Sequence, residues 1–273
     1  MWTTADAIAI PISVAICVAL GVLAYFLLRN RPRVYKQIPL MLTVGVMIVL
    51  EIIKITRHLV IADEFNSRYL PFHMSSYFMV WFSLAAFGWG RVRQVGMTAS
   101  FITSFGFLFG FFYQPSWIIG GASANLFNNW GAFHSFVYHL MFIQFLIFII
   151  ALDLFRPKIK YFLFVLPLIF GLLSISLVMA HVLQVNYFNL LYGTGPFAYI
   201  SENWGQWVLV VILFALSLAA GCLAFFAFGI PYELVRQRFR KTENKGTANR
   251  ITDPQVQEIS SSEGQSTASP EPS

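Results

Sequence analysis

Seven long apolar stretches constrain this chain more than any other feature of its sequence. Each is close to the ~20 residues that an α-helix needs to cross the ~30 Å hydrocarbon core of a bilayer. They cover residues 7–28, 38–61, 71–89, 95–113, 132–152, 161–182 and 207–228. Because open strands cannot satisfy their backbone hydrogen bonds in lipid, the sequence predicts an all-α, polytopic membrane bundle of seven transmembrane helices.

The composition excludes the soluble classes of protein. Of the 273 residues, 58% are hydrophobic and only 11% are charged, whereas soluble domains carry about 25% charged residues. A soluble enzyme, a disordered protein and a nucleic-acid binder with a basic surface are therefore not expected. The two cysteines, Cys17 and Cys222, lie in apolar stretches, where we expect packing rather than a disulfide or a metal site. We expect no cofactor.

The basic residues alternate along the chain. Most of the 18 Lys and Arg residues follow the first, third, fifth and seventh apolar stretches, at residues 29–36, 91–93, 156–160 and 236–250. Cytoplasmic loops of membrane proteins carry such an excess of Lys and Arg. The pattern predicts a multi-pass protein of the cell membrane with its N-terminus outside and its C-terminus in the cytoplasm.

The end of the chain differs from the rest. Residues 241–273 are rich in Ser, Glu, Thr, Gln and Pro and are too polar to build a core. We therefore predict a transmembrane domain over residues 1–232 and a basic, then disordered, cytoplasmic tail over 233–273. The basic run before the tail should lie against anionic head groups, so membrane lipids are the expected partners, and the sequence points to no nucleic acid and no particular protein.

The second apolar stretch contains ionisable residues at membrane depth. Glu51, Lys54 and His58 are spaced i, i+3 and i+7, so they share one helix face. Such groups usually face the interior of a bundle and pair there, and we expect Glu51 to pair with Lys54. A structural ion pair near the interface, with Lys54 and Arg57 reaching toward water, is an equally good interpretation.

The predicted topology places all five histidines in the outer half of the bundle. One interpretation is a polar cavity on that side; the other is that polar residues at helix ends cost little. His134 and His139 are about 140° apart around a helix, so we expect no metal site. The candidate binding residues, the last two from the loop after the sixth stretch, are Glu51, Lys54, His58, His73, His134, His181, Asn186 and Tyr187.

The third stretch begins with a histidine beside two serines. Pro71 suits the first turn of a helix, and His73 and Ser76 are three residues apart. A serine hydroxyl needs a nearby base to act as a nucleophile at neutral pH. Serine and histidine in membrane helices more often form hydrogen bonds between helices, so both interpretations stay open at this point.

Three segments, in this order, resemble the bacterial YwaF-type integral membrane proteins. Residues 70–75 resemble that family's Leu-Pro-x-His/Gln-x-Cys segment. Residues 133–139 resemble its aromatic-rich helix start that ends in a histidine, and residues 186–190 resemble its Asn-Tyr-x-x-Leu loop. The resemblance runs from about Gln37 to Phe228.

The resemblance implies a lipid-directed activity. Distant animal relatives of the YwaF-type proteins include a phospholipid-directed acyltransferase and fatty-ester hydrolases, which use a Cys or Thr nucleophile and a His on another span. By that resemblance, Ser75 is the nucleophile and His139 its partner, on the outer-leaflet side. Ser75 stands where the family has Cys, and a hydroxyl needs a stronger base than a thiol. The alternatives are a non-enzymatic transporter or sensor with a polar extracellular-side cavity, or an accessory membrane protein.

Overall fold

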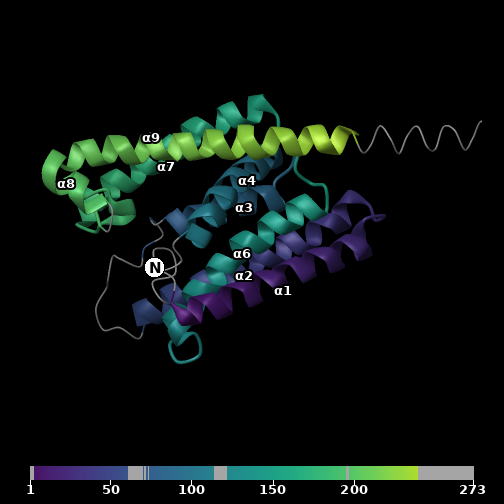
Figure 1. The fold of residues 1–273 in the computed structure, drawn as a ribbon, viewed down its shortest axis with the longest axis horizontal. Coiled ribbons are helices and arrows are strands. Elements are labelled where there is room, and N and C mark those ends of the chain that lie inside the picture. Colours follow the sequence, from purple (N-terminus) through teal and green to yellow (C-terminus); the bar gives the residue numbers. More distant parts are fainter. Residues whose placement is uncertain are drawn as a thin grey trace, which may run out of the picture. The chain divides into compact units, whose positions relative to one another are not determined.

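The computed structural model is all-helical over the residues that it describes (Figure 1). These are residues 3–60, 70, 72, 74–113, 122–194 and 197–238, without the side chains of 58–60, 74, 75, 109, 110, 113 and 122. His73, the side chains of His58 and Ser75, and most of the predicted tail therefore lie outside the described residues.

Helices occupy all seven apolar stretches. They are α1 (Thr4–Leu28), α2 (Arg33–Val60), α3 (Met74–Phe87), α4 (Gly90–Tyr113), α6 (Trp130–Ala151), α7 (Ile159–Leu183) and α9 (Gln206–Leu223). Within the described ranges, five helices are long and apolar enough to cross a membrane: α1, α2, α6, α7 and the helix that begins at Gln206. Seven crossings and the orientation of the termini stay predictions.

Several helices are longer than the apolar stretches that predicted them. α2 begins at Arg33 and α4 at Gly90, in both cases about five residues before the apolar run. Charged side chains at a helix end reach toward the head groups while the backbone stays helical, so hydropathy alone places such ends too late. α3 is shorter than predicted and is followed closely by α4, where Gly90 has a φ of 53°, a conformation that glycine adopts at little cost.

The chain divides into two compact units, Met1–Ala227 and Phe228–Ser273. After α9 the helix widens into a π-helical segment at Ala224–Gly229, and residues 230–238 are helical again. In the second unit Arg236 pairs with Glu233 at 2.7 Å. The domain boundary predicted at residue 232 stays a prediction.

In the first unit α4 and α6 connect most of the other helices. α6 contacts α1, α2 and α4, and α4 contacts α3, α7 and α9. Figure 1 shows α3 and α4 between the group of α1, α2 and α6 and the pair of α7 and α9. The helix beginning at Trp130 is the most buried of the candidate spans, so side chains on its inner face are the best placed for a site away from lipid.

Aromatic rings fill the space between α3, α4 and α6. Phe82 stacks on Phe145 with 4.1 Å between ring centroids, and Phe78 meets Phe142 edge-on at 4.6 Å. Each such pair contributes about 0.5–1.5 kcal/mol beyond burial. Since lipid tails are as apolar as the side chains, close packing of this kind holds membrane helices together.

Short helical segments lie in the connections. η2 (Ala122–Asn125) precedes α6, and η3 (Tyr187–Asn189) and α8 (Ala198–Trp204) lie between α7 and α9. Both connections are ones that the predicted topology places on the outer side. η2 lies next to the start of α6, and η3 lies next to the end of α7. Both of these helices carry candidate site residues.

Candidate functional site

A buried carboxylate joins α2, α3 and α6. Glu51 of α2 is 3% exposed, and its Oε1 accepts hydrogen bonds from Lys54 at 2.5 Å and from the Ser76 hydroxyl at 3.5 Å. Its Oε2 lies 3.8 Å from Nε2 of His134. The predicted pair of Glu51 and Lys54 is therefore present. We call Glu51, Lys54, Ser76 and His134 the Glu51 cluster.

The contacts of the Glu51 cluster balance a costly burial. An isolated charge at membrane depth costs several kcal/mol unless it is paired and hydrogen-bonded. The Lys54 side chain is 20% exposed, so its ammonium group approaches Glu51 from the less buried side. His134 completes the cluster from α6, where its ring stacks on Tyr138 at 5.3 Å.

His139 turns its ring toward α4. The ring stacks on Phe107 with 5.4 Å between ring centroids and 4° between ring planes. Phe142 meets it edge-on with 5.5 Å between centroids. Its Nδ1 lies 2.6 Å from the backbone oxygen of Ser135. Because a carbonyl oxygen only accepts, Nδ1 carries the proton of the neutral ring and Nε2 carries the lone pair. Among the described residues, no group donates to that Nε2.

His181 also bonds through Nδ1 to the backbone oxygen four residues earlier, but its Nε2 has a partner. Its Nδ1 donates to the oxygen of Leu177 at 2.9 Å, but its Nε2 accepts from the Gln206 amide at 3.1 Å. The same amide nitrogen donates to the oxygen of Leu190 at 2.9 Å. His181 thus joins α7 to α9, and its basic nitrogen is already engaged.

The sequence comparisons agree with a helical membrane protein. A family model matches residues 1–226, a range that runs from the N-terminus to the π-helical segment. The chain belongs to the TMEM164 family. That family consists of multi-pass membrane proteins, in agreement with the five long apolar helices. No curated protein and no solved structure matches the chain.

This TMEM164 family chain divides the predicted binding residues between two places. Glu51, Lys54 and His134 come together where α2 packs on α6. His181, Asn186 and Tyr187 lie on α7 and the connection after it, and α7 packs on α4 and α9. Those predicted binding residues that the structure describes therefore form two groups, one around the Glu51 carboxylate and one around the loop after α7.

Asn186 and Tyr187 hold the loop of the TMEM164 family chain in place. The Asn186 Oδ1 accepts from the backbone N–H groups of Leu191 at 3.0 Å and Tyr192 at 3.3 Å, and its Nδ2 donates to the Tyr192 oxygen at 2.9 Å. Tyr187 is fully buried and packs edge-on against Phe72 at 5.7 Å. Burial raises the pKa of the Tyr187 hydroxyl, so the hydroxyl stays protonated.

Two groups near the candidate site were not singled out by the sequence. Tyr138 lies against His134, and its position four residues later on the same helix could have indicated the contact. Phe107 gave no signal, because it is one phenylalanine in an apolar run that contains many. Within the described ranges, no group of three His, Cys, Asp or Glu side chains is placed to hold a metal ion.

Proposed function

We propose that this TMEM164 family protein is a membrane enzyme that transfers or hydrolyses the acyl group of a lipid ester. The observation that carries the proposal is the hydrogen bond from His139 Nδ1 to the Ser135 oxygen at 2.6 Å. It leaves Nε2 with a free lone pair, which is the form that a general base requires. The ring contacts of His139 with Phe107 and Phe142 turn the imidazole toward α4.

Ser75 is the proposed nucleophile, on the strength of the resemblance to YwaF-type proteins and of helix spacing. It lies in the first turn of α3, three residues before Phe78, and residues with that spacing share a helix face. Phe78 packs on Phe142 at 4.6 Å and on Phe107 at 6.2 Å. Both rings also contact His139, so the residue that shares a helix face with Ser75 by spacing belongs to the same aromatic group as that histidine.

The reaction follows from these roles. The Ser75 hydroxyl attacks the acyl carbonyl while His139 Nε2 takes its proton. The tetrahedral intermediate collapses, and the imidazolium returns the proton to the oxygen of the leaving alcohol. Water or a second lipid hydroxyl then attacks the acyl-serine, again losing its proton to His139. The new acid or ester leaves, and the proton returns to Ser75.

The predicted topology gives the reaction a place. With the N-terminus outside, the start of α3 and the first turns of α6 lie on the outer side of the bundle. The reaction would then take place at the level of the outer-leaflet head groups of the cell membrane. Membrane lipids are the proposed substrates, and their ester groups lie at that depth.

The experiment labels the purified protein in lipid nanodiscs with a long-chain alkyl fluorophosphonate, which reacts with activated serines. We expect wild type to be labelled, Ser75→Ala to be unlabelled, and His139→Gln to react at least about 100-fold more slowly, the lower end of the typical contribution of a general base. The control is Ser174→Ala, because the hydroxyl of the exposed Ser174 donates to the Phe170 oxygen of its own helix. Equal labelling of wild type and Ser75→Ala would contradict the proposal.

The Glu51 cluster favours a second function, binding by a transporter or sensor without turnover. Ionisable groups at membrane depth usually serve a function, and Glu51 lies 3.8 Å from His134. A lipid ester that raises the unfolding temperature of the wild type, without labelling or hydrolysis, would favour this function over the enzyme.

A further inference from the structure

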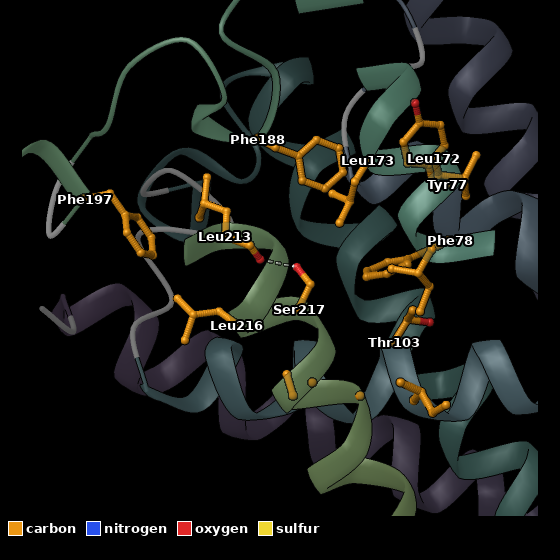
Figure 2. A pocket seen from close by; sticks show the side chains of 15 residues that line it. Tyr77, Phe78, Thr103, Leu172, Leu173, Phe188, Phe197, Leu213, Leu216 and Ser217 are labelled. Carbon is orange, nitrogen blue, oxygen red and sulfur yellow. Dashed lines mark hydrogen bonds between the residues drawn. The ribbon is translucent and has the colours of Figure 1, made fainter. Parts of the chain in front are cut away.

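A cavity of about 270 Å³ lies between α3, α4, α7 and α9 (Figure 2). Small residues create the space, namely Gly106 on α4 and Ala220 and Gly221 on α9. A Cβ atom built on Gly106 would meet no atom within 4 Å. The glycine therefore opens onto free volume, and a larger side chain there would enter the cavity.

The hydroxyl groups in the cavity wall are already engaged. Thr103 donates to the Ala99 oxygen at 2.7 Å, and Ser217 donates to the Leu213 oxygen at 2.8 Å. Figure 2 shows the Ser217 hydroxyl turned back onto its own helix.

The hydroxyl of Tyr77 is engaged as well. It lies 2.8 Å from the Ser176 hydroxyl, which itself donates to the Phe72 oxygen at 3.2 Å, so Tyr77 is the donor of the pair. In Figure 2 this hydroxyl points away from Ser217 and Thr103. These wall groups leave no donor for a polar ligand, whereas a hydrocarbon loses no hydrogen bond on entering.

The cavity extends along α9. Leu213 and Gly221 both line it, and eight residues of helix span about 12 Å. The volume is below the ~300–1,000 Å³ of pockets that hold drug-sized ligands. An apolar space of this length and small volume fits one linear chain better than a fused ring system.

Phe188, in the loop after α7, lines the cavity. Its φ of 55° and ψ of 19° lie in the left-handed region, which is unusual for a bulky residue. Its ring lines the cavity and stacks on Tyr77 at 6.0 Å. Strained residues of this kind cluster at ligand clamps, and the hydrogen bonds of Asn186 with Leu191 and Tyr192 span the loop that contains Phe188.

We infer that this cavity binds a linear hydrocarbon chain, with the Phe188 ring against it at the loop end. The chain is that of a free fatty acid or the tail of a phospholipid, because both present the same methylene surface. Apolar cavities stay dry, so the chain replaces free volume rather than bound water. The site differs from the Glu51 cluster, and the inference stands whether or not the protein turns a lipid over.

The experiment uses two photoreactive probes with the full chain in phosphatidylcholine nanodiscs. One probe is a fatty acid with a mid-chain diazirine, and the other is a phosphatidylcholine that carries the same chain. We expect adducts on peptides of α4 and α9 near Gly106 and Ser217. Cavity adducts from the free acid alone identify a fatty-acid site, and cavity adducts from the phospholipid probe identify a tail site.

Gly106→Phe fills the cavity, so the yield of probe adducts on α4 and α9 should fall at least ten-fold from that of wild type. The control is Gly45→Phe on α2, whose Cβ position is equally free of neighbours, and its adducts should match those of wild type. Ser217→Phe fills the cavity from α9 and replaces Gly106→Phe if the latter does not elute as a folded protein. Ser75→Ala should keep its cavity adducts even if it loses fluorophosphonate labelling, which separates this inference from the proposed enzyme.

Two results would overturn the inference. The first is cavity adducts of wild-type strength in both filled variants. The second is adducts of both probes confined to lipid-exposed residues, such as Leu163 and Phe164 on α7.

Discussion

Glu51 and Lys54 form an ion pair one turn apart on α2, with 2.5 Å between Oε1 and Nζ. The carboxylate is almost fully buried, and the Ser76 hydroxyl and the His134 ring approach it from α3 and α6. A buried pair of this kind adds little net stability, but the loss of one partner leaves a charge with inadequate compensation. The pair therefore makes the two residues interdependent.

That interdependence predicts that Glu51→Gln raises the free energy of unfolding when it is added to a Lys54 variant. Lys54→Met should lower the free energy of unfolding by about 3 kcal/mol, because it leaves the buried Glu51 carboxylate without its cationic partner. Adding Glu51→Gln should recover most of that loss. Thermal unfolding in detergent checks this, with the exposed Lys158→Met as a control that should change little. If the double variant lost as much stability as the two single variants lose together, the result would contradict the pairing.

The parts of the fold that were predictable are those that depend on local sequence. Lengths of about 20 apolar residues predicted the positions of the helices because backbone groups in lipid must bond within a helix. The spacing of Glu51 and Lys54 predicted their contact for a similar reason, since i and i+3 residues are neighbours on a helix surface.

Contacts between different helices were not predictable in the same way. His139 packs on Phe107, but in a helix that is apolar on all sides the pattern does not tell which face is inward. The bond between His181 and Gln206 depends on how α7 meets α9, and the cavity beside Gly106 depends on four helices. Such arrangements follow from packing shape rather than from periodicity.

Asp6 ties the start of α1 to η2. Its carboxylate is fully buried, accepts from the backbone of Thr3 at 2.9 Å, and accepts a hydrogen bond from the Ser123 hydroxyl. Ser123→Ala removes a donor to a buried charge and should cost about 1–3 kcal/mol. Ser174→Ala, which removes only a bond within one helix, should cost less than about 0.5 kcal/mol. Equal unfolding temperatures for the two variants would refute this role of Ser123.

Gly96 sets the distance between α3 and α4. A Cβ there would lie 2.5 Å from the backbone nitrogen of Ala85 and 2.7 Å from the carbonyl carbon of Leu84. Gly96→Ala must therefore push the two helices apart, at a cost of about 1–3 kcal/mol. Gly45→Ala meets no atom within 4 Å and should instead stabilise its helix by up to about 1 kcal/mol. Unfolding measurements that rank the two variants the other way would show that the helices are not in close contact at Gly96.

Phe188 offers a test of backbone strain that is separate from ligand binding. Its φ of 55° is costly for any residue with a Cβ, by about 1–2 kcal/mol. Phe188→Ala and Phe188→Gly lose the same ring contact with Tyr77, but only glycine relieves the backbone. The glycine variant should therefore be more stable than the alanine variant by about 1 kcal/mol.

The matched position for this test is Phe214, which lies inside α9 and packs on Phe170 at 5.5 Å. There the order should reverse, because alanine is favoured over glycine by about 1 kcal/mol in a helix. Denaturant titration of the four purified variants gives both differences. If alanine were the more stable residue at both positions, the left-handed conformation of Phe188 would not be a feature of the folded protein in solution.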